Sequence, residues 1–416
     1  MKNQKYVSNK KFEKKVNKMS VDEFVASVNG LLPKTRTEFV DNVQNICDKI
    51  KDMTYKMYIL MKYEHPSCLN TGTEMRFILS SKKDMADNNS QLVQYSNGII
   101  FAMSENGCRV LCRPMRDLFN IRTEITPEYK VYHIQEGTTV NMYFYKGQWV
   151  ISTRSGFDMR DVTWRGEKTY GTIVREVLGD YDFSVLDQNA TYTFGFRHPD
   201  LHPFDSAGGH SVWNIGTPEM PGLPTQTLVE DTSNLYELAA RGLDDYLAGT
   251  RPYNLGYICR GDGLKQDVII ESTLLTTIRK LIYDLPSKTA QSTENFKSMD
   301  YVVLENFMDF RRRDLFSRVF PEFNPKMQFY RELFDEVVTK VHTLMVRYEE
   351  LYISGSAQKS HIVIDFPSDT LADKLVHFYY PIVRNIITAY NNTSIVKLIS
   401  DIIISSKYTP SIFPLF

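Results

Sequence analysis

The side chains of this sequence that are best suited to metal binding lie between residues 196 and 210. The segment reads FRHPDLHPFDSAGGH and contributes three histidines and two aspartates: His198, Asp200, His202, Asp205 and His210. Imidazole and carboxylate groups bind transition metals, so the cluster could form a metal site. Its two prolines and two glycines predict a loop, however, and no partner ligands stand at helical spacing elsewhere. We therefore predict a loop of hydrogen-bonded polar residues without a metal.

A second group of interest is the arginine run in DFRRRDLFSRVF, residues 309–320. Arg311, Arg312 and Arg313 stand beside aromatic residues and could contact the phosphates of a nucleic acid. Asp309 and Asp314 flank the run and reduce its local positive charge. The pattern favours a solvated helix face, with nucleic-acid contact as the alternative.

The third candidate is the stretch YHIQEGTTVNMYF at residues 132–144, which is followed by STRSG at 152–156. Alternating apolar residues and the Glu-Gly pair at 136–137 predict two strands and a turn, a hairpin built around an active site. No Ser-His-Asp order, phosphate-binding lysine loop or zinc-finger spacing occurs in the sequence, so these mechanisms are not indicated.

Three zones of different pattern must position these residues. Residues 1–72 read as a helical N-terminal extension, with a capping box from Ser20 to Glu23. Residues 73–285 alternate short β-branched and aromatic runs with turn residues, and SENG and YKG occupy positions of hairpin turns. Residues 286–416 return to helical periodicity. We therefore predict an α+β fold whose antiparallel β domain lies between two helical regions.

The helical prediction for the N-terminal and C-terminal regions rests on one stripe of apolar residues in each region. Their members recur at steps of three and four, as residues on one helix face do: Phe39, Val43, Ile46, Ile50, Met53 and Met57 in the first region, and Tyr330, Leu333, Val337, Val341, Leu344, Tyr348 and Leu351 in the second.

Composition limits the classes of protein that fit. The 416 residues carry a net charge of −1 with 42% hydrophobic residues, so a globular protein is expected and any nucleic-acid site must be a local patch. The five cysteines form no CxxC pair, and their odd number argues against a disulfide framework. No secretory h-region or membrane-length apolar run is present. We expect a soluble, cytoplasmic protein.

Read in order, the β zone resembles the bacteriophage RNA ligase family that repairs tRNA, within the covalent nucleotidyltransferases. SNGIIFAMSENGCRVLCRPMRDLFNI at 96–121 is similar to the Gly-Ile-X-Phe strand, turn and Ser-Arg-Pro segment of that family. YKVYHIQEGTTVNMYFYKGQWVISTRSG falls where the family has Lys-x-Asp-Gly, and YTFGFRHP and YNLGYI resemble its Phe-Glu-Phe and Glu-Gly-Tyr-Val segments. The resemblance covers about residues 75–280 and implies a nucleotidyltransferase-type domain.

The chemistry of that family explains the residue types that these segments need. A lysine amine attacks the α-phosphate of ATP and forms a lysyl-AMP intermediate. A carboxylate contacts the ribose, and two glutamates bind or orient a divalent metal. Two lysines near the end of the domain stabilise charge in the transition state.

This sequence departs from the pattern at most of those positions. The resemblance places Ile134 at the nucleophilic lysine, Glu136 at the aspartate, Gly195 and Leu255 at the two glutamates, and Ile269 and Glu271 at the two lysines. Arg113 and Gly137 are the nucleotide-binding residues that match. An apolar residue avoids the cost of an unpaired buried charge, so these replacements indicate a disused pocket.

Another lysine could serve if the alignment is shifted. Lys130 lies four residues before Ile134, on the same face of the expected strand but about 13 Å away at ~3.3 Å per residue. Lys146 belongs to the expected YKG turn and should be exposed.

The resemblance and the departures together indicate a catalytically degenerate RNA ligase-like protein without a cofactor. It would be retained as an RNA-binding protein or as a structural, assembly component of a virus. The alternative is an active ATP-dependent RNA ligase that uses ATP and Mg²⁺. Because related ligases occur in phages and large DNA viruses, a viral origin in host cytoplasm or virion is expected by analogy.

The C-terminal segment YTPSIFPLF is apolar in a chain that is otherwise polar. Ile412, Phe413, Leu415 and Phe416 would be exposed if the segment were free, so we predict that it docks on its own domain or on a partner. Pro410 and Pro414 predict an extended rather than a helical segment.

Overall fold

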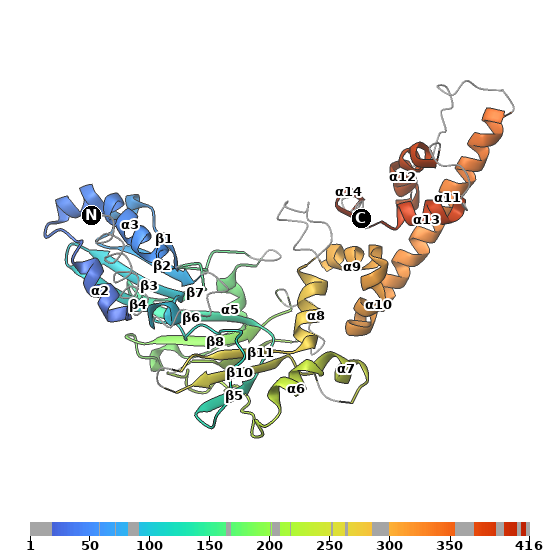
Figure 1. Ribbon diagram of the computed structural model, residues 1–416. Helices are drawn as coiled ribbons and strands as arrows, with labels where there is room; N and C mark the ends of the chain where they lie inside the picture. Colours follow the sequence, from blue (N-terminus) through green and yellow to red (C-terminus); the bar gives the residue numbers. More distant parts are fainter. Residues whose placement is uncertain are drawn as a thin grey trace, which may run out of the picture. The chain divides into compact units, whose positions relative to one another are not determined.

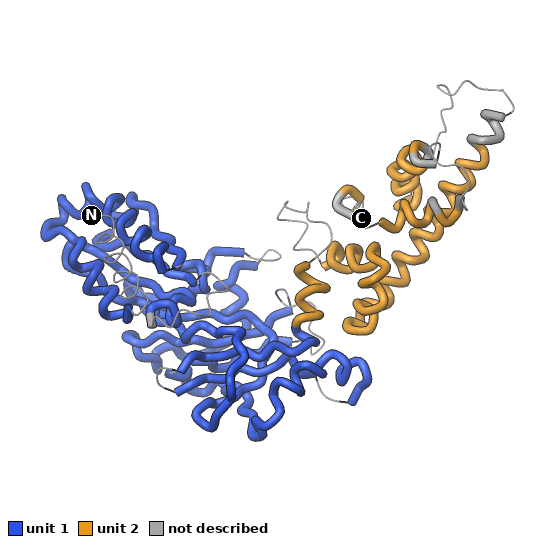
Figure 2. Tube along the Cα trace, viewed as in Figure 1, with its two compact units in different colours: residues 1–275 blue, residues 276–416 orange. Residues whose placement is uncertain are grey.

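The computed structural model divides the chain into two compact units, residues 1–275 (unit 1) and residues 276–416 (unit 2), which we describe separately (Figure 2). The residues that the structure describes are 19–57, 59–70, 72–81, 91–163, 168–199, 201, 209–216, 218–250, 253–262, 265–284, 299–353, 370–387, 395–405 and 409–412.

The described residues of unit 1 form three sheets whose strands pair antiparallel, so the predicted α+β class is confirmed (Figure 1). Sheet A has the order β1-β2-β3-β4, sheet B β11-β10-β5 and sheet C β7-β6-β8-β9. The bounds are β1 (Ile59–Tyr63), β2 (Met75–Ser81), β3 (Asn97–Ser104), β4 (Gly107–Cys112), β5 (Tyr129–His133), β6 (Thr138–Tyr145), β7 (Gln148–Ser152), β8 (Thr191–Arg197), β9 (Ser211–Asn214), β10 (Gly256–Gly261) and β11 (Val268–Glu271).

Helices α2 (Val21–Asn29) and α3 (Arg36–Tyr55) pack on sheet A and share one core with it. The predicted capping box is confirmed, because Ser20 and Glu23 each accept the other's backbone N–H. The predicted stripe is buried at Phe39, Val43, Ile46 and Ile50 of α3 and at Met57 just after the helix, while Met53 is half-buried. Strand β1 begins inside the region expected to be wholly helical, and its apolar residues pair with β2.

Sheet C is covered by α5 (Tyr170–Leu178), which the sequence YGTIVREVLGD predicts. Apolar residues of β6 and β8 point to one side of the sheet and pack against Ile173 and Val174 of the helix. The predicted YKG turn joins β6 to β7, with positive φ at Lys146 and Gly147, and the predicted SENG turn joins β3 to β4.

Sheet B packs one face against α6 (Leu235–Ala240), through Val131, Tyr257, Cys259, Val268 and Ile270. The short α7 (Gly242–Leu247) and α8 (Thr273–Ile282) follow α6 and β11 in the chain. The remaining short elements of unit 1 are α4 (Gln91–Tyr95), η1 (Pro66–Asn70) and η2 (Phe183–Val185).

The hairpin expected at residues 132–144 does not form. Strand β5 pairs with β10 in sheet B, whereas β6 pairs with β7 and β8 in sheet C. The Glu136–Gly137 pair is therefore a corner between two sheets. Local alternation predicted both strands correctly, but it carries no information about partners that lie more than a hundred residues away in sequence.

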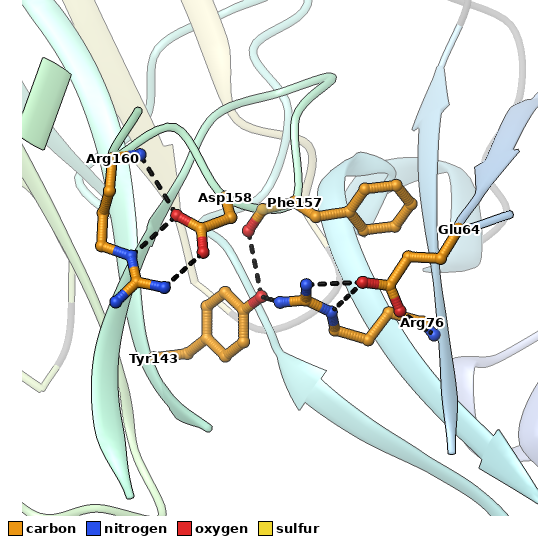
Figure 3. A network of polar contacts seen from close by, with 6 residues as sticks. All are labelled: Glu64, Arg76, Tyr143, Phe157, Asp158 and Arg160. Carbon is orange, nitrogen blue, oxygen red and sulfur yellow. Dashed lines mark hydrogen bonds and ion pairs between the residues drawn. The ribbon is translucent and has the colours of Figure 1, made fainter. Parts of the chain in front are cut away.

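A polar network links sheets A and C (Figure 3). Arg76 of β2 donates to Glu64 at 2.9 and 2.6 Å and to the Tyr143 hydroxyl of β6 at 2.9 Å. Tyr143 in turn donates to the Phe157 carbonyl at 3.0 Å. Burial would lower the pKa of Arg76, but the bonds to Glu64 and Tyr143 outweigh it and hold the pKa above its ordinary value. The two sheets are thus joined by a charge that is fully partnered.

The described residues of unit 2 form helices and their connections, as predicted for the C-terminal region. The helices are the greater part of α8, from Thr276 on, and α9 (Met299–Met308), α10 (Phe310–Val319), η4 (Pro321–Phe323), α11 (Asn324–Ile353), α12 (Leu371–Ile387), α13 (Ile395–Ile403) and α14 (Thr409–Ile412). The long α11 packs against α9, α12 and α13. Its predicted stripe is buried at Tyr330, Leu333, Val337 and Val341 and half-buried at Leu344, while the side chains of Tyr348 and Leu351 lie outside the described residues.

The C-terminal segment is helical at residues 409–412, so the prediction of an extended segment was wrong there. Pro410 lies in the first turn of α14, where the missing N–H breaks no intrahelical bond. Ile412 is fully buried and α14 packs against α9. Phe413, Leu415 and Phe416 lie outside the described residues.

The domain limits predicted at residues 72 and 285 stay predictions, since the second falls at the start of the undescribed segment 285–298. Among the described helices, none combines the length and the apolar character that a bilayer span requires.

Candidate functional site

Most of the positions where the resemblance places catalytic groups lie on sheet B. Ile134 directly follows β5, and its N–H donates to the Gly256 carbonyl at 3.0 Å. Gly256 pairs with Glu271, and Ile258 pairs with both Tyr132 and Ile269. Strand alternation puts these side chains on the face opposite α6. We call it the motif face, and its members are Lys130, Tyr132, Ile134, Ile258, Arg260, Ile269 and Glu271.

Leu255 stands at the edge of this group. Its side chain is 3% exposed, and its carbonyl accepts the Ser272 N–H at 3.1 Å. The next residue, Gly256, has φ +115°, and a Cβ there would lie 2.1 Å from the Ile270 carbonyl oxygen. The backbone therefore requires the glycine, while the leucine beside it needs only an apolar environment.

The two glycine positions of the resemblance lie under one indole ring. Trp213 of β9 pairs with Gly195 of β8 and is 6% exposed. A Cβ on Gly195 would lie 2.4 Å from Cε2 of Trp213, and a Cβ on Gly137 would lie 2.4 Å from its Cη2. The indole thus fills the space that a glutamate at position 195 would need. Trp213 was not recognised from the sequence, because its pairing with Gly195 is a contact between two strands that motif spacing does not record.

Glu136, at the aspartate position, accepts a hydrogen bond from the Tyr253 hydroxyl at 3.1 Å and is half-buried. Glu271 is half-buried on the motif face, two residues from Ile269 on the same strand. These carboxylates are the two ionisable groups among the six positions where the family carries catalytic side chains, and Glu271 has the charge opposite to the lysine expected there.

The far end of the motif face is strongly polar. Asp267, whose side chain is fully buried, accepts from Arg116 at 2.7 Å and from Arg260 at 2.7 Å. Arg116 also donates to the Lys265 carbonyl at 2.8 Å, and Asp267 accepts the Gly261 N–H at 3.1 Å. This cluster fastens the segment after β4 to the β10–β11 hairpin. Sequence inspection missed it, because Arg116 is 151 residues from Asp267.

Arg113, the matching polar residue of the resemblance, contacts the helices near sheet A. Its guanidinium lies 3.7 Å from Asp22 at the start of α2 and 5.7 Å from the centre of the Tyr95 ring. Its side chain is about half exposed. These contacts lie between the end of β4 and the helices α2 and α4, and the predicted nucleotide-binding role of Arg113 stays a prediction.

The two lysines that could replace the missing nucleophile, Lys130 and Lys146, lie in different surroundings. Lys130 is exposed and pairs with Arg260 in the ladder between β5 and β10. Lys146 lies in the β6–β7 turn, as predicted, with its ammonium 5.1 Å from the centre of the Tyr145 ring.

The arginine run begins α10 of unit 2, and two of its members point inward. Arg312 donates to the Asn306 side chain at 2.9 Å and to the carbonyls of Lys280 and Asp284. Arg313 donates to the Phe307 carbonyl at 2.7 Å and lies over the Phe307 ring. Burial lowers the pKa of both guanidinium groups. Only Arg311 of the three is exposed.

The histidine-rich segment is described at its two ends. The structure brings His198 and His210 together, with stacked rings whose centres are 4.3 Å apart. Glu176 of α5 joins them, its Oε2 atom 2.8 Å from Nε2 of His198. The sequence reading missed Glu176 because it lies in a separate helix. Asp200, His202 and Asp205 lie outside the described residues.

Comparison with known proteins gives viral relatives for the chain. No protein-family model matches it. A protein named "Putative RNA-ligase" from a South African tick isolate of African swine fever virus is 20% identical over 329 residues, which are 64% of this chain and 71% of the relative. A protein of the same name from a Kenyan pig isolate is 19% identical over 342 residues, 68% of this chain and 74% of the relative.

Among solved structures, an archaeal ATP-dependent RNA ligase is similar over 70% of this chain and 73% of its own, with 16% identity and a TM-score of 0.33. That superposition is too loose to define a shared fold. The viral relatives confirm the predicted resemblance to RNA ligase-like nucleotidyltransferases. They also agree with the predicted viral kinship.

Proposed function

We propose that this protein is a catalytically degenerate RNA ligase-like protein that has lost nucleotide transfer and serves as a binding or structural component. The observation that carries the proposal is the motif face, where Ile134 and Ile269 stand at two positions that would need lysines. A branched alkyl group cannot attack a phosphate or stabilise a phosphorane-like charge.

The packing around Trp213 supports the same proposal. A carboxylate at position 195 would have to displace an indole that is almost fully buried. A covalent ligase also needs polar groups that stay paired in the empty site, since an unpartnered buried charge costs several kcal/mol. Apolar residues at 134, 255 and 269 need no charged partner. They also lack the lysine amines that would contact the phosphates of ATP and the carboxylate that would bind Mg²⁺.

The alternative is an active ATP-dependent RNA ligase, and the name carried by the viral relatives favours it. In that case a lysine other than the residue at position 134 forms the lysyl-AMP. Lys130 is the best-placed candidate, because it lies on β5 on the same face as Tyr132 and Ile134, two and four residues before them.

A self-adenylylation assay distinguishes the degenerate protein from the active RNA ligase. The full chain is incubated with ATP labelled at the α-phosphate and with Mg²⁺ or Mn²⁺, then denatured and analysed for covalent label. We expect none, and none for Ile134→Lys, because Gly195 and Leu255 still lack carboxylates. A stable adduct that disappears in Lys130→Arg but persists in Lys146→Arg would establish the active-ligase alternative instead.

For the RNA-binding form of the proposal, Arg311 is the residue of the run that can reach a phosphate. Arg312 and Arg313 donate hydrogen bonds to backbone carbonyls of unit 2. A triple substitution would therefore change both RNA binding and the stability of unit 2, and the two effects could not be separated. We therefore propose Arg311→Ala, with Arg318→Ala on the same helix as matched control. If Arg311 contacts RNA, its loss should reduce the salt slope of binding to single strands by about 0.7 and Arg318→Ala should not.

For the assembly form, the buried end of α14 gives a test. Ile412→Ala should lower the stability of unit 2, by about 2 kcal/mol or more for a fully buried isoleucine. Deletion of residues 413–416 leaves Ile412 in place. Loss of a higher-order species in sedimentation after that deletion, with unchanged thermal stability, would identify the terminal residues as a partner site. RNA binding without any self-association would favour the RNA-binding form.

A further inference from the structure

The sequence predicts no metal in the histidine-rich loop. The structure nevertheless brings three side chains that can bind a metal close together, two of them at the ends of this loop. Glu176 of α5, His198 after β8 and His210 before β9 each offer one ligand atom, and these atoms all lie within 4.8 Å of one another. The three come from separate elements of unit 1. Their convergence therefore reflects the fold of sheet C rather than local sequence.

We propose that Glu176, His198 and His210 form a zinc-binding site. Zinc takes imidazole nitrogens and carboxylate oxygens at about 2.0–2.2 Å in tetrahedral geometry, which places neighbouring ligand atoms about 3.3 Å apart. The observed Oε2–Nε2 distance of 2.8 Å between Glu176 and His198 is a little shorter than this. Zinc binding would require the carboxylate and the exposed His210 ring to rotate toward that spacing, and the three ligand atoms lie within 4.8 Å of one another before any such change.

The burial of the three residues suits a bound cation. His198 is 2% exposed, so its ring is fixed against the sheet, whereas Glu176 and His210 are exposed and leave an entry from solvent. Three protein ligands with an open side match a zinc site that completes its shell with water. The two histidines bracket residues 199–209, so the metal would tie both ends of that loop to α5.

A cation already occupies part of this position. The ammonium group of Lys168 lies 2.9 Å from Oε2 of Glu176, the same oxygen that contacts His198. Zinc would have to displace Lys168 from this oxygen, and removal of the lysine should therefore strengthen zinc binding. This expectation distinguishes a metal site from a simple hydrogen-bonded cluster.

The test uses the full chain, freed of metal with a chelator and then titrated with Zn²⁺ against a chromophoric competitor. We expect one tightly bound zinc per chain and a rise in melting temperature on binding. His210→Ala is the main variant, because an exposed side chain can be removed without unfolding the sheet. Loss of a ligand should weaken binding by more than the roughly 10–100-fold typical of a residue that only supports a ligand.

Two further variants complete the design. His65→Ala removes an exposed histidine outside the cluster and should leave zinc affinity unchanged. Lys168→Met should raise the affinity, and Co²⁺ in place of zinc should give the visible absorption of a tetrahedral site. Absence of stoichiometric zinc uptake, or equal uptake by the wild type and His210→Ala, would overturn the proposal. The inference does not depend on whether the protein ligates RNA.

Discussion

The two ends of the motif face of sheet B differ in the side chains that they carry, which are charged at one end and apolar at the other. At one end, the buried Asp267 is held by Arg116 and Arg260, with both carboxylate oxygens paired at 2.7 Å. At the other end, Ile134, Ile258 and Ile269 stand on neighbouring strands. Both ends belong to the same three strands and the same face, so the fold itself does not impose either character.

The difference teaches which buried charges a sheet of this kind retains. Asp267 has partners that belong to the chain itself, and the cluster therefore needs no ligand to be satisfied. Lysines at 134 and 269 would need a bound nucleotide as partner, and they would be unpaired whenever the site was empty. A chain without that ligand is expected to keep the first kind of charge and to replace the second.

The largest effect should come from breaking the polar end. Asp267→Asn keeps the side-chain shape but leaves two largely buried guanidinium groups without a counter-charge, which should cost about 3 kcal/mol of unfolding free energy. Urea unfolding followed by tryptophan fluorescence measures this in unit 1, since Trp149, Trp164 and Trp213 all lie there. Asp262→Asn, on an exposed position of the same hairpin, should change stability by less than about 0.5 kcal/mol. A loss below that limit for Asp267→Asn would contradict the comparison.

An intermediate effect should come from adding a methyl group under Trp213. Replacing a glycine of ordinary backbone conformation by alanine usually stabilises a protein by about 0.4–1 kcal/mol. At Gly195 the new Cβ would lie 2.4 Å from the indole, so we expect the opposite sign and a loss of about 1–3 kcal/mol. The measurement is again urea unfolding.

The matched control is Gly30→Ala, where the nearest atom would be 3.5 Å away and φ is −66°. It should be neutral or stabilising. In a Trp213→Ala background, the penalty of Gly195→Ala should largely vanish, because the two sites share one space. An undiminished penalty in that background would mean that the indole is not what fills position 195.

The smallest effect should come from the polar network of Figure 3, at Asp158. Burial would raise the pKa of this carboxyl, but hydrogen bonds and charge from Arg160 outweigh it, and the net pKa is lowered. The stabilisation is therefore present above the ordinary pKa of 3.8 and is lost as the pH falls through the lower, folded value. We expect Asp158→Asn to destabilise by at most about 1 kcal/mol at pH 7.

That difference should shrink as the pH is lowered through and below about 4, because the wild-type carboxyl then becomes protonated. Asp161→Asn, an exposed neighbour, serves as control and should show no such trend. A difference between wild type and Asp158→Asn that stays constant or grows in acid would show that Asp158 does not act through its charge.

Much of the local structure could be predicted from the sequence, because local structure depends on local spacing. The capping box at Ser20, the stripe of α3 and the SENG and YKG turns each follow from residues within one or two turns of chain. The assignment of β5 and β6 to one hairpin failed, because pairing is decided by partners such as β10 and β8 that are distant in sequence.

The candidate site was predictable only in part for the same reason. Ile134, Leu255 and Ile269, which the resemblance aligns with catalytic positions, lie in neighbouring segments of one sheet, while their catalytic assignment stays a prediction. The indole over Gly137 and Gly195, the carboxylate of Glu176 beside His198, and the inward turn of Arg312 come from contacts that no spacing records. Side chains that fill or complete a site from another element are invisible to motif reading.

The backbone requirement at Gly256 bears on which residues of this edge of sheet B can be exchanged. The glycine is fixed by its positive φ and by the Ile270 carbonyl, whatever residue stands before it. The segment Leu255–Gly256 thus combines one position that the backbone conformation restricts to glycine with one that it leaves open. Exchange of Leu255 for another residue can therefore alter the chemistry of this edge of sheet B, while Gly256 keeps the pairing of β10 with β11 unchanged.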